Sequence, residues 1–194
     1  SLYNRNRYDE FDEFLNWLLT VLQEKHIEVL LIAGDIFDTT TPSNRAQEQY
    51  FSFLRKVRQT QCRHVVIIAG NHDSPSLLEA PSGLLRDMDI HVVGAVRDDI
   101  ADEVLELKDS AGNTELIVCA VPYLRDRDLR KSIAGESISN KEQNILLGLR
   151  HHYQQAFHIA EQKRMHAKSS THKEIPIVAM GHLFTSGGKT KEGD

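Results

Sequence analysis

Three short apolar runs in this sequence each end in a glycine followed by polar side chains. The runs cover residues 28–33, 64–69 and 175–180, and the segments that close them are Gly34-Asp35, Gly70-Asn71-His72-Asp73 and Gly181-His182. Short continuous apolar runs rich in β-branched residues are typical of strands buried on both faces. Because the carboxyl ends of strands in an open α/β sheet line one crevice, we expect the closing segments to converge.

Helical periodicity separates these strands. The first helix is expected over 8–25, where the apolar positions are Phe11, Phe14, Leu15, Leu18 and Leu22. A second helix should begin with Thr41 as its N-cap and Pro42 in its first turn, and a long third helix should begin near Ser139. A strand, a helix and a second strand in succession predict a parallel pair of strands.

Further strands are expected at 90–93, 104–107 and 115–121, with a hairpin loop at 109–113 between the last two. The fold class is therefore α/β. A chain of 194 residues, 40% of them hydrophobic, can bury a core as one domain without disulfides. We expect Cys62 and Cys119 to be buried, reduced thiols, as in a reducing cytosol.

Charge and hydropathy narrow the class of protein. The 28 acidic and 23 basic residues leave a formal net charge of -5, which argues against a small, basic nucleic-acid-binding module but leaves nucleic-acid enzymes open. No apolar stretch is long enough to span a membrane, and the first ten residues contain no apolar signal-peptide centre. A cytoplasmic protein without a membrane partner is expected.

The side chains at the strand ends are carboxylates, an amide and imidazoles, without a thiolate. This mixture suits Mn, Fe or Zn in a hydrolytic centre. Two divalent ions that share a carboxylate can bind a phosphate and activate water, and Asp35 is the candidate for the bridging carboxylate. The simpler alternative is that Asp35 is only a turn residue after a strand.

The segments Gly34-Asp35-Ile36-Phe37-Asp38, Gly70-Asn71-His72-Asp73 and Gly181-His182 resemble the second, third and fourth motifs of the calcineurin-like metallophosphoesterases. The resemblance implies a β-sandwich flanked by helices. By position it implies that Asp35 bridges two Mn²⁺ ions and that Asn71 and His182 are further ligands. It also implies that His72 is the catalytic histidine and that Asp38 orients it.

Alternatives remain open for two of these aspartates. Asp38 is also placed where a turn or N-cap residue would precede the second helix. For Asp73 a structural role, bracing its loop, is the favoured interpretation.

Three longer segments, at 14–19, 34–47 and 120–129, are similar to the SbcD family of bacterial nuclease subunits. This similarity implies a Mn²⁺-dependent exonuclease and endonuclease that cleaves DNA ends and hairpins in repair and recombination. The implied partners are DNA, an SbcC-type ATPase and a second nuclease subunit, in a heterotetramer. The alternatives are a phosphodiesterase or phosphatase for small substrates and a noncatalytic scaffold.

The sequence departs from the family pattern at both ends. It has no Asp-x-His motif before the first helix, and Gly181-His182 is followed by Leu183-Phe184 rather than by a second histidine motif. We therefore expect residues 1–194 to be a partial domain, truncated at both ends, with an incomplete metal site.

Several other side chains have competing interpretations. Four histidines on the long helix are expected to be solvated: His151, His152, His158 and His166. The mixed-charge segment 124–131 is either a solvated face or a contact to a DNA backbone. Phe11, Trp17 and Tyr50 could serve subunit pairing, although core packing is the simpler interpretation.

Overall fold

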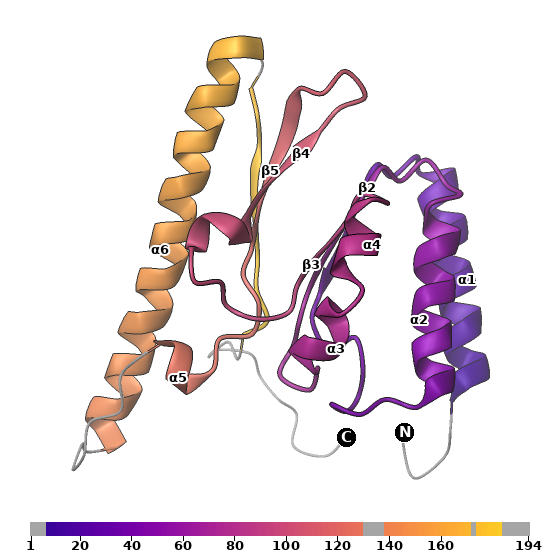
Figure 1. Cartoon of the computed structure of the whole chain (residues 1–194), viewed down its shortest axis with the longest axis horizontal. Helices are drawn as coiled ribbons and strands as arrows, with labels where there is room; N and C mark the ends of the chain where they lie inside the picture. The colour runs from indigo at the N-terminus through magenta and orange to yellow at the C-terminus, as the bar shows by residue number, and fades with distance from the viewer. Residues whose placement is uncertain (1–6, 130–137, 172–173, 184–194) are drawn as a thin grey trace.

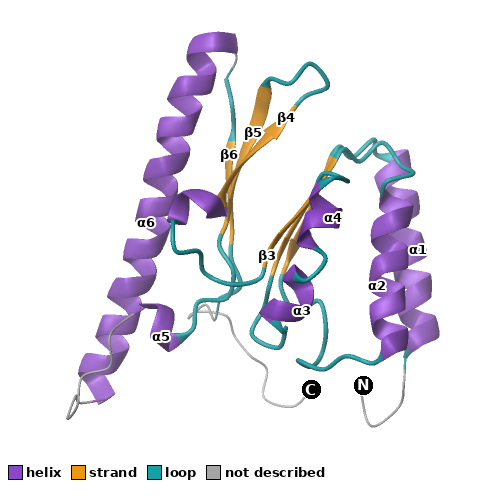
Figure 2. Ribbon diagram, viewed as in Figure 1, coloured by secondary structure: helices purple, strands orange, loops and turns teal. Residues whose placement is uncertain are grey.

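The computed structural model describes residues 7–129, 138–171 and 174–183. Two three-stranded sheets face each other in the middle of the molecule (Figure 1). Helices α1 and α2 lie on the outer side of one sheet, and the long helix α6 covers the outer side of the other (Figure 2). The predicted α/β sandwich flanked by helices is confirmed.

The first sheet is entirely parallel. Its strands have the order β1-β2-β3, with β1 at Val29–Ala33, β2 at His64–Ile68 and β3 at Ile90–Val93. Helix α1 precedes β1, α2 connects β1 to β2, and α3 and α4 connect β2 to β3. The bounds are Tyr8–Glu24 for α1, Asn44–Val57 for α2, Pro75–Glu79 for α3 and Ser82–Arg86 for α4. The parallel strand pair and the first helix were both predicted.

The second sheet is mixed and has the order β4-β5-β6. A 3₁₀ helix, η1, leads into β4, and β4 and β5 form the predicted antiparallel hairpin. Helices α5 and α6 precede β6, which pairs with β5 in parallel. The bounds are Ile100–Glu103 for η1, Val104–Lys108 for β4, Thr114–Ala120 for β5, Asp126–Leu129 for α5, Ile138–Thr171 for α6 and Ile177–Met180 for β6.

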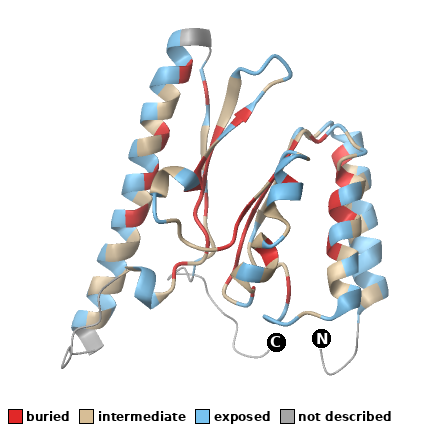
Figure 3. Cartoon of the chain, in the orientation of Figure 1, coloured by how far each residue is buried: buried red, intermediate tan, exposed pale blue. Residues whose placement is uncertain are grey.

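Three apolar layers hold these elements together. One lies between the first sheet and helices α1 and α2, one between the two sheets, and one between the second sheet and α6. Strand β2 is buried along its whole length, as Figure 3 shows. Strands β1 and β6 were expected to be equally buried, but most of their residues are half-exposed because each is an outer strand of its sheet among the described residues.

Two local predictions in the first two helices were wrong. Helix α2 is capped by Ser43, whose Oγ accepts a hydrogen bond from the backbone N–H of Ala46 at 3.2 Å, and not by Thr41. On α1, Phe11 and Trp17 are 60% and 59% exposed because they lie off the stripe that packs against the core, which is formed by Leu15, Leu18, Leu19 and Leu22.

Tyr50 does pack in the core, edge-on to Phe37, with ring centroids 5.4 Å apart. The two cysteines, Cys62 and Cys119, are buried and form no disulfide. Burial raises the pKa of the Cys62 thiol and raises that of Cys119 to about 11, so both thiols keep their protons at neutral pH. In the part of the chain that the structure describes, no helix is both long and apolar enough to cross a membrane.

The expectation that His152 is solvated was also wrong. The other three histidines of α6 are exposed as predicted, but His152 is 6% exposed and its Nε2 lies 2.7 Å from Oε2 of the fully buried Glu103. The other carboxylate oxygen of Glu103 accepts the backbone N–H of Arg97 at 2.9 Å. This buried pair joins α6 to η1, the element that leads into the second sheet.

Replacing His152 by Ala removes the partner of a buried carboxylate. We expect His152→Ala to lower the free energy of unfolding by about 3 kcal/mol. The exposed neighbour His151 supplies the control, and His151→Ala should change the free energy of unfolding by less than about 0.5 kcal/mol. Urea unfolding followed by circular dichroism measures both values, and equal values for the two variants would contradict the structural role of the pair.

Candidate metal centre

Three predicted metal ligands come together where β1, β2 and β6 end. Asp35 follows β1, Asn71 follows β2 and His182 follows β6. Nε2 of His182 lies 3.0 Å from Oδ1 of Asn71 and 3.5 Å from Oδ2 of Asp35. The expected convergence therefore takes place between strand ends of two facing sheets, and not along the edge of one sheet.

Two glycines allow this close approach. A Cβ atom on Gly34 would lie 2.4 Å from Nδ1 of His182, and one on Gly70 would lie 2.2 Å from Oδ1 of Asp35. Gly34 also has a φ of +88°, in the region that favours glycine. The glycines that close the first two runs are thus required by the packing of the ligands themselves.

The hydrogen bonding of His182 suits the role of metal ligand that the sequence predicts for it. Its Nδ1 lies 2.9 Å from the carbonyl oxygen of Ala33, which can only accept, so Nδ1 donates and carries the proton. In the neutral imidazole, Nε2 then presents a lone pair toward the oxygens of Asn71 and Asp35. Three lone-pair donors that face one another fit a divalent metal ion.

The donor set is small. The described residues contain no group of three or more His, Cys, Asp and Glu side chains that could hold a metal. The centre as described consists of one carboxylate, one imidazole and the amide oxygen of Asn71.

Asp73 braces the loops that carry the first two ligands. Its fully buried carboxylate accepts backbone N–H bonds from Gly70 at 2.8 Å, from Phe37 at 2.9 Å and from Ile36 at 3.1 Å. The structural role predicted for Asp73 is therefore confirmed. It ties the loop after β1 to the loop after β2.

His72 lies exposed beside this cluster. Its backbone N–H donates to Oδ1 of Asp35 at 3.2 Å, and its Nδ1 lies 3.1 Å from the main-chain carbonyl oxygen of Asp38. The sequence predicts contact between these two residues, but the hydrogen bond involves the carbonyl rather than the carboxylate. Because a carbonyl oxygen only accepts, this contact places the single ring proton of a neutral His72 on Nδ1. Nε2 then carries no proton and does not take part in the contact.

Sequence reasoning did not assign Tyr123 and Tyr153 to this region. The Tyr123 ring stands edge-on to the His182 ring, with centroids 6.2 Å apart, and the Tyr123 N–H donates to the carbonyl of Ala69. The hydroxyl of Tyr153 donates to the carbonyl oxygen of Met180 at 3.4 Å. The sequence could have indicated Tyr123, because it follows a strand end closely, as the other site residues do. It contains no comparable indication for Tyr153, which lies in the middle of a helix.

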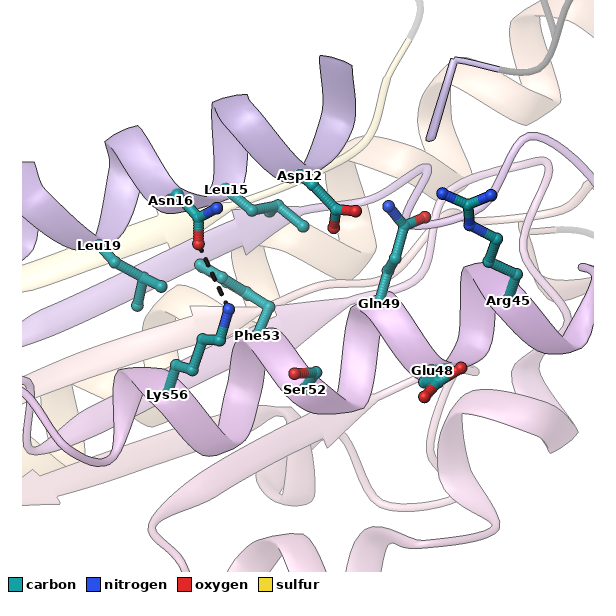
Figure 4. A pocket seen from close by; sticks show the side chains of 10 residues that line it. All are labelled: Asp12, Leu15, Asn16, Leu19, Arg45, Glu48, Gln49, Ser52, Phe53 and Lys56. Carbon is teal, nitrogen blue, oxygen red and sulfur yellow. Dashed lines mark hydrogen bonds between the residues drawn. The ribbon is translucent and has the colours of Figure 1, made fainter. Parts of the chain in front are cut away.

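A separate groove of about 220 Å³ lies between α1 and α2. Figure 4 shows its apolar side chains Leu15, Leu19 and Phe53, and the hydrogen bond at 3.3 Å from Nζ of Lys56 to Oδ1 of Asn16. None of the candidate metal ligands lines this groove.

The sandwich and its strand-end donors define a phosphoesterase fold, and comparison with known families agrees. The chain belongs to the calcineurin-like phosphoesterase family, whose model matches residues 6–186. This confirms the family predicted from the three motifs.

Among curated proteins, the chain is similar to the SbcD subunit of the SbcCD nuclease of Escherichia coli (strain K12), with 32% identity over 192 residues, 99% of this chain and 45% of the relative. The SbcD protein of Bacillus subtilis (strain 168) is 27% identical over 198 residues, 100% of this chain and 46% of the relative. The chain thus spans about half the length of these relatives. The DNA double-strand break repair protein Mre11 of Sulfurisphaera tokodaii is 29% identical over 85 residues, 43% of this chain and 21% of the relative.

The three hydrogen bonds to Asp73 lead to a stability prediction. Asp73→Ala leaves three N–H groups without their acceptor, two of them in buried hydrogen bonds, and we expect a loss of about 3 kcal/mol in the free energy of unfolding. Asp98 is exposed, and Asp98→Ala should keep the free energy of unfolding within about 0.5 kcal/mol of the parental value. Chemical unfolding measures both, and a small loss for Asp73→Ala would refute the bracing role.

Proposed function

We propose that this chain carries the nuclease activity of an SbcD-type protein and hydrolyses phosphodiester bonds of DNA with Mn²⁺. The observation that carries the proposal is the convergence of Asp35, Asn71 and His182 beside an exposed His72. Membership of the calcineurin-like phosphoesterase family supports phosphoester chemistry. The names of the SbcCD nuclease and Mre11 relatives support DNA as the substrate.

Asp35, Asn71 and His182 would hold the metal, with Asp35 as the bridging ligand of two ions in a complete site. A divalent metal bound there would polarise the phosphate of the substrate and activate a water molecule for attack at neutral pH. The chain's own residues orient these groups: the Ala33 carbonyl fixes the ring of His182, and Asp73 holds the two loops that carry Asp35 and Asn71. The site geometry is thus set largely by main-chain contacts.

His72 would act on the substrate rather than on the metal. Its Nδ1 is held by the Asp38 carbonyl, so its Nε2 is the nitrogen that can meet a phosphate. In the protonated imidazole, Nε2 donates a hydrogen bond to the scissile phosphate and then a proton to the leaving oxygen. Asp38 fixes the orientation of the ring in this scheme.

The proposed substrates are DNA ends and hairpins, cut by exonuclease and endonuclease action in DNA repair and recombination. The relatives named as parts of the SbcCD nuclease support an SbcC-type ATPase as the partner, and a cytoplasmic location agrees with that role. Residues 124–129 of the mixed-charge segment are a candidate contact to the DNA backbone because Tyr123, just before them, lies beside His182; residues 130 and 131 lie outside the described part of the chain.

A second copy of the nuclease subunit is the further proposed partner. Phe11, Phe14 and Trp17 are 60%, 51% and 59% exposed on α1, and the rings of Phe14 and Trp17 lie 5.8 Å apart. An aromatic surface of this kind is typical of an interface. We propose that it pairs two subunits, as expected for a homodimer within a heterotetramer.

Cleavage of an end-labelled DNA duplex in Mn²⁺ tests the nuclease function in the full-length protein. We expect His72→Ala to lower the rate about 10²- to 10⁴-fold, because it removes the proton donor. We expect Asp35→Ala to abolish Mn²⁺-dependent cleavage, since the bridging ligand is lost. His151→Ala, at an exposed histidine on α6, is the control and should cleave at the parental rate.

Two results would contradict this function. Hydrolysis of a small chromogenic phosphodiester by a protein that leaves DNA intact would indicate a small-substrate phosphodiesterase. Binding of the ATPase partner by a protein that cleaves neither substrate would indicate a scaffold.

Sedimentation velocity tests the proposed pairing. The double variant Phe14→Glu and Trp17→Glu places charges on the aromatic surface and should convert a dimer into a monomer. Leu147→Glu, at a residue 60% exposed on α6, should stay dimeric. A parental protein that is monomeric at all concentrations tested would rule out the α1 interface as a self-associating surface.

A further inference from the structure

Helix α6 contacts the chain directly before the candidate ligand His182. The hydroxyl of Tyr153, on α6, donates to the carbonyl oxygen of Met180, the last residue of β6. A Cβ atom on Gly181 would lie 2.0 Å from that hydroxyl oxygen, so a glycine is needed for Tyr153 to approach. Figure 1 shows α6 running alongside β6.

The position of Tyr153 is itself well determined. The preceding residue, His152, forms the buried pair with Glu103. One turn of helix further on, Ala156 is fully buried, and its small side chain lets α6 lie close to the second sheet. Two more turns along, Nζ of Lys163 donates to the carbonyl oxygen of Val104 at 2.6 Å. These contacts hold Tyr153 on a rigid element.

The hydroxyl of Tyr153 also keeps its proton. Burial, together with the negative charges of Glu103 and of Cys119 in its thiolate form, raises the pKa of Tyr153 to about 12. The group therefore remains a hydrogen-bond donor at neutral pH. Because the Met180 carbonyl is an acceptor, the polarity of the contact does not change over the working range of pH.

His182 is thus supported from two sides. Its ring is held by the carbonyl of Ala33 on the side of the first sheet. The backbone that leads to it is held by Tyr153 on the side of α6. We propose that Tyr153 is a positioning residue that sets the place of the His182 imidazole relative to Asp35 and Asn71. The inference rests on the proposed function only in taking Mn²⁺ as the ion that these side chains bind.

The test compares two single variants on one helix. Tyr153→Phe keeps the ring and removes the hydroxyl, and Phe157→Leu changes an aromatic residue that is 54% exposed one turn away. Isothermal calorimetry measures the Mn²⁺ dissociation constant, and NMR of the metal-free protein measures the ring resonances of His182. We expect Tyr153→Phe to weaken Mn²⁺ binding about tenfold and to shift the His182 resonances. Phe157→Leu should do neither.

A double variant tests the contact itself. In the parental protein Gly181→Ala forces its methyl group onto the Tyr153 hydroxyl, whereas in the Tyr153→Phe protein that oxygen is absent. Gly181→Ala should therefore weaken Mn²⁺ binding less in the Tyr153→Phe background than in the parent, so the two effects are not additive.

The outcomes separate this inference from the proposed function. Unchanged Mn²⁺ affinity and unchanged His182 resonances in Tyr153→Phe would overturn the positioning role, as would equal shifts in Phe157→Leu. If the parental protein binds no Mn²⁺, the proposed metal centre fails. The His182 resonances then decide alone: a shift confined to Tyr153→Phe supports the positioning role, and its absence overturns it.

Discussion

The buried carboxylate of Asp73 joins the two loops on which the candidate metal centre depends. It accepts one backbone N–H from its own loop, at Gly70, and two from the loop after β1, at Ile36 and Phe37. A carboxylate is stable inside a protein when several donors satisfy its lone pairs. Since all three donors are main-chain groups, the interaction determines the paths of two loops, and the placement of the ligands that they carry depends on it.

The third candidate ligand, His182, comes from the other sheet, and a different kind of force brings it there. Val66 and Ile68 of β2 pack in one apolar layer with residues of β5 between the sheets. Apolar packing of this kind is strong but does not specify direction. The directional contacts are the hydrogen bond between His182 and the Ala33 carbonyl and the close approach allowed by Gly34. Together they align β6 with the end of β1.

Much of this arrangement was predictable from the sequence because it depends on local patterns. Strands, the hairpin and the first helix follow from short-range periodicity, and the glycines and polar residues that close the runs indicate the site. Leu149 and Ala156 lie three residues before and four residues after His152, so helical spacing places His152, and not His151, on the buried face of α6. The sequence could not show that its buried partner is Glu103, 49 residues earlier in the chain, because that contact joins distant elements. Phe11 and Trp17 are exposed for a similar reason, because packing against the neighbouring elements decides how wide the contact surface of α1 is.

The sequence alone therefore determined the class of fold, the residue types at the strand ends and the family to which they belong. The tertiary structure decided that two facing sheets supply the candidate ligands, that Asp38 meets His72 through its carbonyl, and that α6 contacts the strand end directly before His182. The physical reason is the range of the interactions. Periodicity and turn chemistry act between neighbours along the chain, whereas His182 meets Asn71 and Ala33 across 111 and 149 residues of sequence.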